Sequence, residues 1–392
     1  MTSEPPGRRT ATIRDGATVT PVVTSADGRW GPVAWSYTAD DEAETARVAA
    51  HLVTPPPSPW PSHDRVELRV RSTRDPAALD RLERVASGPA QVLREENYRR
   101  APDGTWVRCG DRPADAEEPG LPRHSVGHRD GRWTILHDDD SGPEQRARVG
   151  EIVLRALVAA AVAALGGLTV HASAATGRDG RAVVFLGDSG AGKSTLALHL
   201  ARAGGRFLSG DRTLLVPGPG GWWAVGAGLL PRYRWGTLEG LGLAGRVRDA
   251  TLLRHGDGRC RVADLPRTPA KVIFTPTESE HVLGARTADC APLGGLVVLS
   301  PAGGAAPVAR GLTPEVTAAA AWAHLLPSDA GCLAGPCPGR PAGAGDLPGP
   351  AEGVAGWGLE WDPVRHRAED ALSHVLADAP GAAPSARRIT AP

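Results

Sequence analysis

One stretch of nine residues constrains the fold of this 392-residue chain more than any other. A short apolar run from Ala182 to Leu186 precedes it and predicts a strand, and the segment from Leu196 to Ala203, closed by two glycines, predicts a helix. A glycine-rich turn at a helix start leaves backbone N–H groups free to face an anion, and the helix dipole adds positive charge there. The stretch consists of Gly187, Asp188, Ser189, Gly190, Ala191, Gly192, Lys193, Ser194 and Thr195.

These residues fit the pattern G-x-x-x-x-G-K-[ST], which is typical of loops that bind the phosphates of a nucleotide. In such a loop Lys193 reaches the terminal phosphates and the Ser194 hydroxyl is a ligand of Mg²⁺. Of the 44 Lys and Arg residues only Lys193 and Lys271 are lysines, so chance seldom places a lysine here. An arginine fork does not replace a compact ammonium between phosphates. We therefore expect a site for ATP and Mg²⁺ rather than an incidental turn that caps a helix.

Two further segments are expected to lie beside this loop. The run from Arg206 to Asp211 predicts a strand that ends in an acid, which is typical of the carboxylate on the Mg²⁺ side of a phosphate loop. Asp211 also fits a turn between two strands, because an apolar run resumes at Thr213. Before the loop, Leu168 to Ala175 predicts a strand that carries His171 and neighbours the strand before the loop.

Composition narrows the partners and the compartment. The formal net charge is zero and no Lys/Arg run appears, which argues against nucleic acid as a main partner. Residues 1–15 hold no apolar signal core, and Arg155 with Gly166-Gly167 interrupts the most apolar stretch, so no membrane partner is expected. The five cysteines, odd in number and scattered, suit a reducing cytoplasm. Cys332 and Cys337 lack the further ligands of a zinc site.

The chain is predicted to hold two domains. Residues 1–140 predict an α+β domain that binds a substrate or partner, and residues 141–392 predict a phosphate-loop domain with a low-complexity loop at 329–352.

His124, His128 and His137, with three following acids, match no standard ligand spacing, so we expect a solvated rim there rather than a metal site. Residues 1–9 and the tail from 379 are expected to be disordered, and the proline-rich segment 54–59 to be a loop. Further helices are predicted at Asp41–Leu52, Asp75–Ala86, 140–165, Thr313–Leu326 and Arg367–Ala377; further strands at Thr10–Ile13, Val19–Val23, Arg65–Val70, Thr213–Val216, Trp222–Val225, Val272–Phe274, Leu296–Leu299 and Gly358–Trp361; and hairpin turns at 103–104 and 130–131.

The run from Leu168 to Asp211 resembles the catalytic core of the HPr kinase/phosphorylase family. It is also similar to relatives of that family that phosphorylate a serine of ribosomally made precursor peptides, such as lasso peptides. The form of the phosphate loop, the preceding strand with His171 and the helix that leads to Asp211 carry the likeness. The resemblance implies an α/β P-loop core, use of ATP and Mg²⁺, and a peptide or small protein as substrate. It also implies catalytic roles for Lys193 and Asp211 and metal ligation by Ser194 and Asp211.

One position departs from that family. Two adjacent acids usually end the strand, the first proposed as the base that takes the serine proton, whereas this chain has Gly210 before Asp211. Either Asp211 or His171 then deprotonates the hydroxyl, or the protein binds nucleotide for regulation or as a scaffold, with little or no transfer. A third interpretation, a phosphate-loop hydrolase, needs a water-positioning Gln or Glu that the sequence does not identify. We expect a cytoplasmic ATP-dependent serine kinase, and a homo-oligomer is left open.

Overall fold

The computed structural model describes residues 25–52, 60, 66–93, 96–110, 120–228, 231–248, 251–254, 258–261, 272–304, 306–326 and 354–377. Several predictions lie outside these residues: the terminal segments, the strands at Thr10–Ile13 and Val19–Val23, the loop 54–59, and the low-complexity segment 329–352 with Cys332 and Cys337. Within the described part, no helix is long and apolar enough to cross a membrane.

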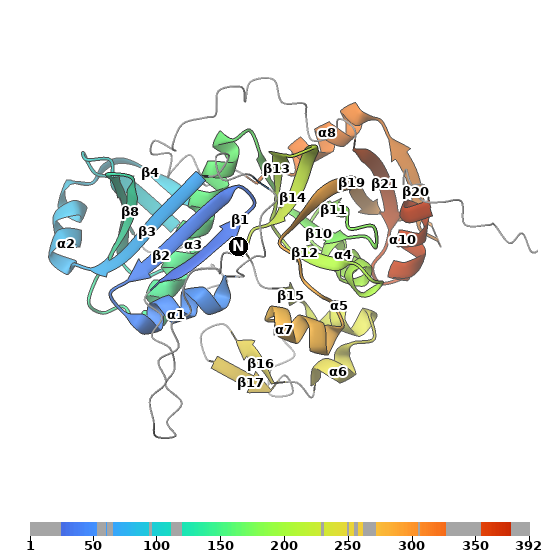
Figure 1. Ribbon diagram of the computed structural model, residues 1–392, viewed down its shortest axis with the longest axis horizontal. Coiled ribbons are helices and arrows are strands. Elements are labelled where there is room, and N and C mark those ends of the chain that lie inside the picture. Colours follow the sequence, from blue (N-terminus) through green and yellow to red (C-terminus); the bar gives the residue numbers. More distant parts are fainter. Residues whose placement is uncertain are drawn as a thin grey trace, which may run out of the picture.

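The chain is a mixed α/β protein with several sheets, and the first holds eight strands (Figure 1). Strand β3 pairs in parallel with β2 and β8, and the remaining neighbours pair antiparallel. Helix α2 begins as predicted, because the Asp75 side chain accepts a hydrogen bond from the Ala78 N–H and Pro76 occupies the first turn. The strands, in sheet order, are β1 (Ala26–Trp30), β2 (Val33–Ala39), β3 (Val66–Arg74), β8 (Arg132–His137), β7 (His124–Arg129), β6 (Trp106–Arg108), β5 (Glu96–Arg100) and β4 (Ser87–Leu93), with α1 (Glu42–His51) and α2 (Pro76–Val85) beside them.

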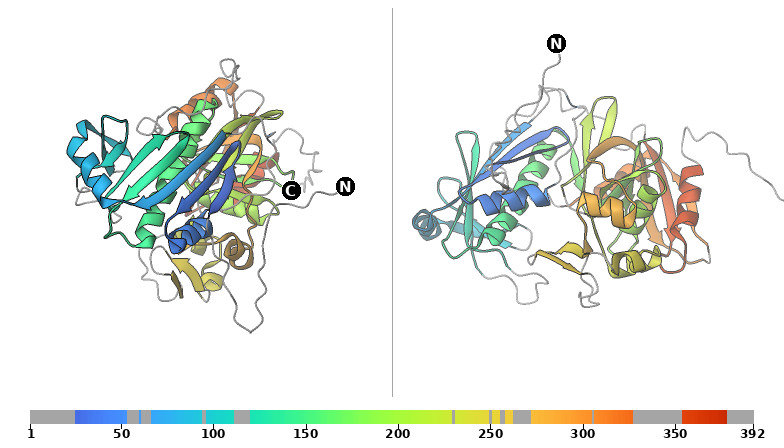
Figure 2. Two further views of the ribbon diagram at one scale, coloured as in Figure 1. Left: turned by 60° about the vertical axis from the view of Figure 1, so that its left-hand side comes forward. Right: turned by 60° about the horizontal axis from the view of Figure 1, so that its bottom comes forward.

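Helix α3 (Pro143–Ala164) runs between the two large sheets in the chain and is buried over most of its length. Its apolar residues share one core with strands of the first sheet and with Leu214, Val216 and Val225 of the second. Figure 2 shows the two sheets side by side with this helix against the first. The helix therefore packs with the elements before it as well as with those that follow, although the predicted boundary at residue 140 assigns it to the second domain.

The second sheet positions the glycine-rich loop of residues 187–195. Strands β11, β19 and β21 are parallel, so their carboxyl ends meet at one edge. Strand β10 pairs antiparallel with β11, as the sequence predicts, and with β12 on its other side. The strands are β12 (Arg206–Ser209), β10 (Ala172–Thr176), β11 (Ala182–Leu186), β19 (Cys290–Pro301), β14 (Gly221–Gly226), β13 (Thr213–Gly218) and β9 (Leu168–Val170), with β21 (Ala355–Trp361) beside β19 and β20 (Val308–Leu312) beside β21.

Helices and two small sheets complete the described part of the chain. Helices α4 and α10 share a core with one face of the second sheet, while α8 contributes to a core on its other face. The remaining elements are α4 (Lys193–Arg202), β15 (Arg232–Tyr233), α5 (Trp235–Gly240), α6 (Ala244–Arg248), β16 (Thr251–Arg254), β17 (Gly258–Arg261), β18 (Val272–Ile273), α7 (Pro276–Glu278), the π-helical turn η3 (Ser279–Leu283), α8 (Pro314–Ala323) and α10 (Ala368–Ala377).

The predicted strand from Leu168 to Ala175 is divided at His171. Strand β9 before it pairs with β13, whereas β10 after it pairs with β11 and β12. The chain changes partners at His171, whose backbone N–H donates instead to the carbonyl of His324 at 2.8 Å. The prediction of a continuous strand is therefore wrong, because its two halves pair with different strands.

Candidate phosphate-loop site

The glycine-rich loop joins the end of β11 to the start of α4. Gly190 and Gly192 both have a φ of 86°, in the left-handed region that favours glycine. Gly192 is also the N-cap of α4, and a Cβ there would lie 2.2 Å from the Trp361 ring. Glycine is required at this position both by the backbone angle and by the close approach of Trp361.

Lys193 lies in the first turn of α4 and is only 7% exposed. Its ammonium donates to the carbonyl oxygens of Gly187 at 2.6 Å and Asp188 at 2.9 Å, so the loop curls around the end of the side chain. Carbonyl oxygens orient an ammonium without neutralising its charge. An anion placed against this loop therefore meets a fixed positive charge together with the helix start.

Ser194 is linked to the end of β12 through a backbone carbonyl. The hydroxyls of Ser194 and Ser173 donate to the Gly210 carbonyl oxygen at 2.9 and 2.8 Å, and the two hydroxyl oxygens are 3.1 Å apart. Ser173 is fully buried in β10. Sequence analysis did not select it; the available signal was a serine among alanines, two positions after His171.

Asp211 follows Gly210 directly and lies beside the His171 imidazole and the Arg232 guanidinium. Its Oδ1 is 3.3 Å from His171 Nε2, and its Oδ2 is 3.7 Å from an Arg232 guanidinium nitrogen. The side chains of His171 and Asp211 are each about one third exposed, so the pair remains open to solvent. Arg232 lies on β15 and contacts the acid.

His324 was not selected from the sequence, yet the fold brings it to the loop. It caps the carboxyl end of α8, and its carbonyl accepts the His171 N–H. Partial burial, and then the charge of Lys193, lower the pKa of the His324 imidazole, while Asp188 acts in the opposite direction and His171 lowers it further. The charges of Asp188 and Lys193, at the two ends of the loop, therefore both act on the His324 imidazole. No local sequence pattern around His324 predicts that it lies beside the loop, because it comes from a helix far away in the chain.

The residues around the loop fit a magnesium–nucleotide complex. The loop amides and Lys193 suit phosphate oxygens, and the Ser194 hydroxyl and Asp211 carboxylate are oxygen ligands of the kind that Mg²⁺ prefers. In the described part of the chain no three His, Cys, Asp or Glu residues are grouped to hold a metal ion. A nucleotide-bound Mg²⁺ uses only one or two protein carboxylates, since phosphates and waters supply the other ligands.

The three histidines of the first sheet do not form the predicted solvated rim. His124 and His137 are fully buried. The two ring nitrogens of His124 each lie 2.7 Å from an oxygen, that of the Tyr98 hydroxyl and that of the Pro122 carbonyl. The His128 ring contacts the Trp133 ring in a tilted arrangement, with the centroids 4.7 Å apart. The prediction is wrong for His124 and His137 because β7 and β8 pair these residues with each other inside the sheet.

Comparison with known proteins adds one distant likeness. No family model and no curated protein matches the chain. Among solved structures, it is similar to the Hpr(Ser) kinase/phosphatase from Coxiella burnetii, with 17% sequence identity and a TM-score of 0.20, over 37% of this chain and 76% of that chain.

Proposed function

We propose that this protein is an ATP- and Mg²⁺-dependent kinase that transfers the γ-phosphoryl group to a serine hydroxyl of a peptide or small protein. One observation carries the proposal: the Gly210 carbonyl joins the Ser194 hydroxyl of the loop to the chain segment that holds Asp211 and its neighbour His171. A phosphate-binding surface and a proton-accepting pair thus belong to one connected site. Transfer to a hydroxyl needs both of these parts.

The chemistry of such a site is positioning and neutralisation of charge. Lys193 and the loop amides hold the phosphates, and bound Mg²⁺ would supply further neutralisation of their oxygens. Asp211 Oδ1 or His171 Nε2 accepts the proton of the attacking hydroxyl, and their 3.3 Å separation lets each orient the other. Because the transition state of phosphoryl transfer is loose, the hydroxyl needs little deprotonation early in the step.

A second candidate function is nucleotide binding for regulation or as a scaffold, with weak or no transfer. Gly210 favours it, because a glycine stands where the resemblance implies a base. Packing does not impose this glycine: a Cβ at position 210 would lie 3.4 Å from a Phe207 ring carbon, which is close to ordinary contact. The missing carboxylate is therefore a property of the sequence and not a steric requirement of the fold.

Nucleotide binding is expected to depend on Lys193. Lys193→Ala removes the ammonium that faces the loop, and we expect ATP·Mg²⁺ to bind roughly 10- to 100-fold more weakly, the range for a charge-assisted hydrogen bond. Isothermal titration of ATP·Mg²⁺ into both proteins measures the change.

Lys193→Met is the matched variant, because it keeps an unbranched side chain in the buried position while removing the charge. Both variants should retain the wild-type circular dichroism spectrum and lose affinity together. Equal ATP affinity in the wild type and both variants would exclude the phosphate-loop function.

A further inference from the structure

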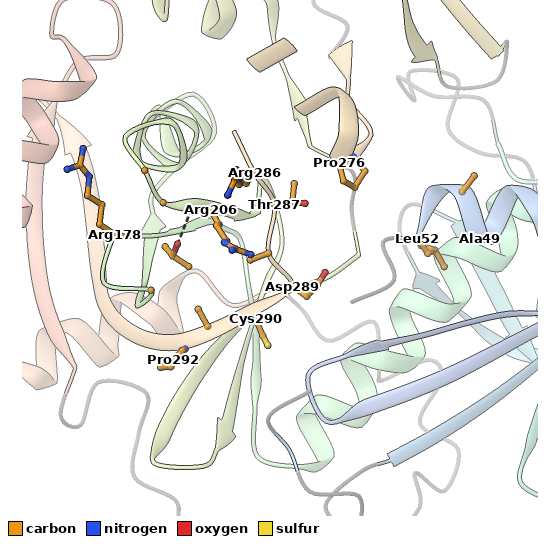
Figure 3. Close-up of a pocket in the computed structure, with 18 residues that line it drawn as sticks. Ala49, Leu52, Arg178, Arg206, Pro276, Arg286, Thr287, Asp289, Cys290 and Pro292 are labelled. Atoms are coloured by element: carbon orange, nitrogen blue, oxygen red, sulfur yellow. Dashed lines mark hydrogen bonds between the residues drawn. The ribbon is translucent and has the colours of Figure 1, made fainter. Parts of the chain in front are cut away.

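A cavity of about 880 Å³ lies away from the phosphate loop (Figure 3). Thr176 and Arg206, which pair across β10 and β12, line it at the end of these strands opposite to the loop. The beginning of β19 lines it as well. Helix α1 contributes Ala49 and Ala50 from the first half of the chain, followed by its C-cap residue Leu52, so the cavity lies between the two halves.

The charges that line this cavity are mostly positive. Arg206 and Arg286 contribute two guanidinium groups, against the single carboxyl of Asp289 among the lining residues, whereas the Arg178 side chain donates to the Ala203 carbonyl at 2.7 Å and points away from them (Figure 3). Burial raises the pKa of that carboxyl to about 6, so its negative charge is itself disfavoured. Arg286 also pairs with Glu280 outside the cavity, at 3.0 Å. An anion that enters the cavity is therefore attracted by an excess of cationic groups.

Between these arginines, glycine backbone without side chains forms part of the cavity wall. Gly177, Gly180, Gly204 and Gly205 all line the cavity, and a Cβ at Gly205 would lie 1.9 Å from the Thr176 carbonyl oxygen. Figure 3 shows Arg206 and Arg286 on one side, with Ala49 and Leu52 facing them across the opening. A volume of about 880 Å³ falls within the range of small-molecule sites, which combine apolar walls with a few directed polar groups.

We propose that this cavity binds a small organic anion with two or more ionised groups, either phosphates or carboxylates. The guanidinium forks of Arg206 and Arg286 hold the charged groups, since planar forks suit carboxylate and phosphate oxygens. The Ala49–Leu52 segment covers the uncharged part of the ligand. Arg206 begins β12 and Asp211 follows its end, so about 16 Å separates this site from the nucleotide site at roughly 3.3 Å per residue. The ligand therefore does not compete with ATP.

The test uses citrate as a carboxylate probe and inorganic pyrophosphate as a phosphate probe. Both are titrated calorimetrically into the Lys193→Ala protein, so that the phosphate loop contributes little to the signal. Arg206→Gln and Arg286→Gln should each weaken binding of the preferred probe about three- to tenfold, whereas Asp289→Asn should tighten it by a similar factor. Because unfolding does not tighten binding, the Asp289→Asn arm separates a local effect from loss of structure.

Arg84→Gln is the matched control, because Arg84 is an exposed arginine on α2 outside the cavity. It should leave the affinity for either probe unchanged. Equal weakening in Arg84→Gln and Arg206→Gln would mean a general charge effect and would overturn the proposal. Failure of both probes to bind would also overturn the proposal. Binding of an acidic peptide such as hexaglutamate, when neither small anion binds, would overturn it as well. Since ATP binding is measured separately, this proposal and the kinase proposal fail independently.

Discussion

At the scale of single residues, the role of Gly210 is carried by its backbone. Its carbonyl oxygen accepts hydrogen bonds from the hydroxyls of Ser173 and Ser194, and it has no side chain to serve as a base. A neutral carbonyl is a poor proton acceptor, so the proton of an attacking hydroxyl must go to a neighbouring group. Asp211 and His171 are the titratable pair next along this chain of contacts.

Loss of that pair is expected to reduce phosphate transfer. Asp211→Asn and His171→Ala should each lower incorporation of radiolabelled phosphate from ATP into a serine-peptide library, by about 100-fold, the low end for a general base. Gly210→Asp should give similar or slightly higher transfer, because position 210 has room for a side chain.

Asp179→Asn is the control, because it removes one negative charge at a position outside the proposed site. Asp179 lies in the exposed turn between β10 and β11, where its side chain accepts the Arg181 N–H, and its loss should leave transfer unchanged. Strong wild-type transfer that survives the double change at His171 and Asp211 would contradict both assignments. Transfer that appears only in Gly210→Asp would favour the binding-only function.

At the scale of elements, β21 supports the loop from a distant part of the chain. Trp361 at its end is buried, and its indole N–H donates to the Ala191 carbonyl at 2.7 Å while the ring packs on Gly192. Strand β21 reaches this edge because it runs parallel to β19, which runs parallel to β11. Two parallel pairings therefore place the ring against the loop.

Trp361→Phe tests this contact. The change keeps an aromatic ring but removes the hydrogen bond to the loop, and we expect ATP to bind about 3- to 10-fold more weakly, the net value of one hydrogen bond. Fluorescence titration with a labelled nucleotide measures the affinity. Trp357→Phe is the matched control, because Trp357 lies on the same strand and packs on Gly295 instead. Equal loss in both variants would indicate a general loss of packing, not loop positioning.

At the scale of the whole molecule, aromatic side chains and α3 join the two large sheets. Trp30 of β1 lies so close to Gly228 that a Cβ there would be 2.0 Å from its ring. The Trp60 and Trp223 rings are 5.2 Å apart, and the Trp60 N–H donates to the Pro217 carbonyl. These contacts, with the core that α3 shares, make the stability of one sheet dependent on the other.

The buried histidines of the first sheet are expected to make this stability depend on pH. Burial lowers the pKa of His124 to about 4 and that of His137 to about 3, below the usual 6.5. The unfolded chain therefore binds more protons below pH 6.5, and the stability present above that pH is lost as the pH falls toward 4. Each histidine should lower the free energy of unfolding by about 2 kcal/mol between pH 7 and pH 5.

Urea unfolding at these two pH values measures the effect. His137→Leu should reduce the pH dependence by about half, because it removes one of the two titrating groups. It also removes two buried ring nitrogens that have no hydrogen-bond partner among the described residues. His128→Leu, a change at a half-exposed ring, is the control and should leave the pH dependence as in the wild type. A dependence that is identical in all three proteins would contradict the role of His137.

The local parts of this protein follow from short stretches of its sequence. The helix at α2 and the hairpins at 103–104 and 130–131 follow from caps and turn residues within a few positions of each other. The glycine-rich loop between β11 and α4 is equally local, because its glycines and lysine act through adjacent backbone. Asp211 was also readable as an acid after a predicted strand, whereas its place near the loop depends on the antiparallel pairing of β12 with β10.

Which distant side chains reach that loop depends on the tertiary fold. His324 comes from α8, Trp361 from β21 and Arg232 from β15, and each depends on strand register or helix packing between segments far apart in the chain. The break at His171 and the burial of His124 and His137 have the same origin. Periodicity encodes which face of an element is apolar, but the partner that covers this face is set by competition among all the elements of the fold.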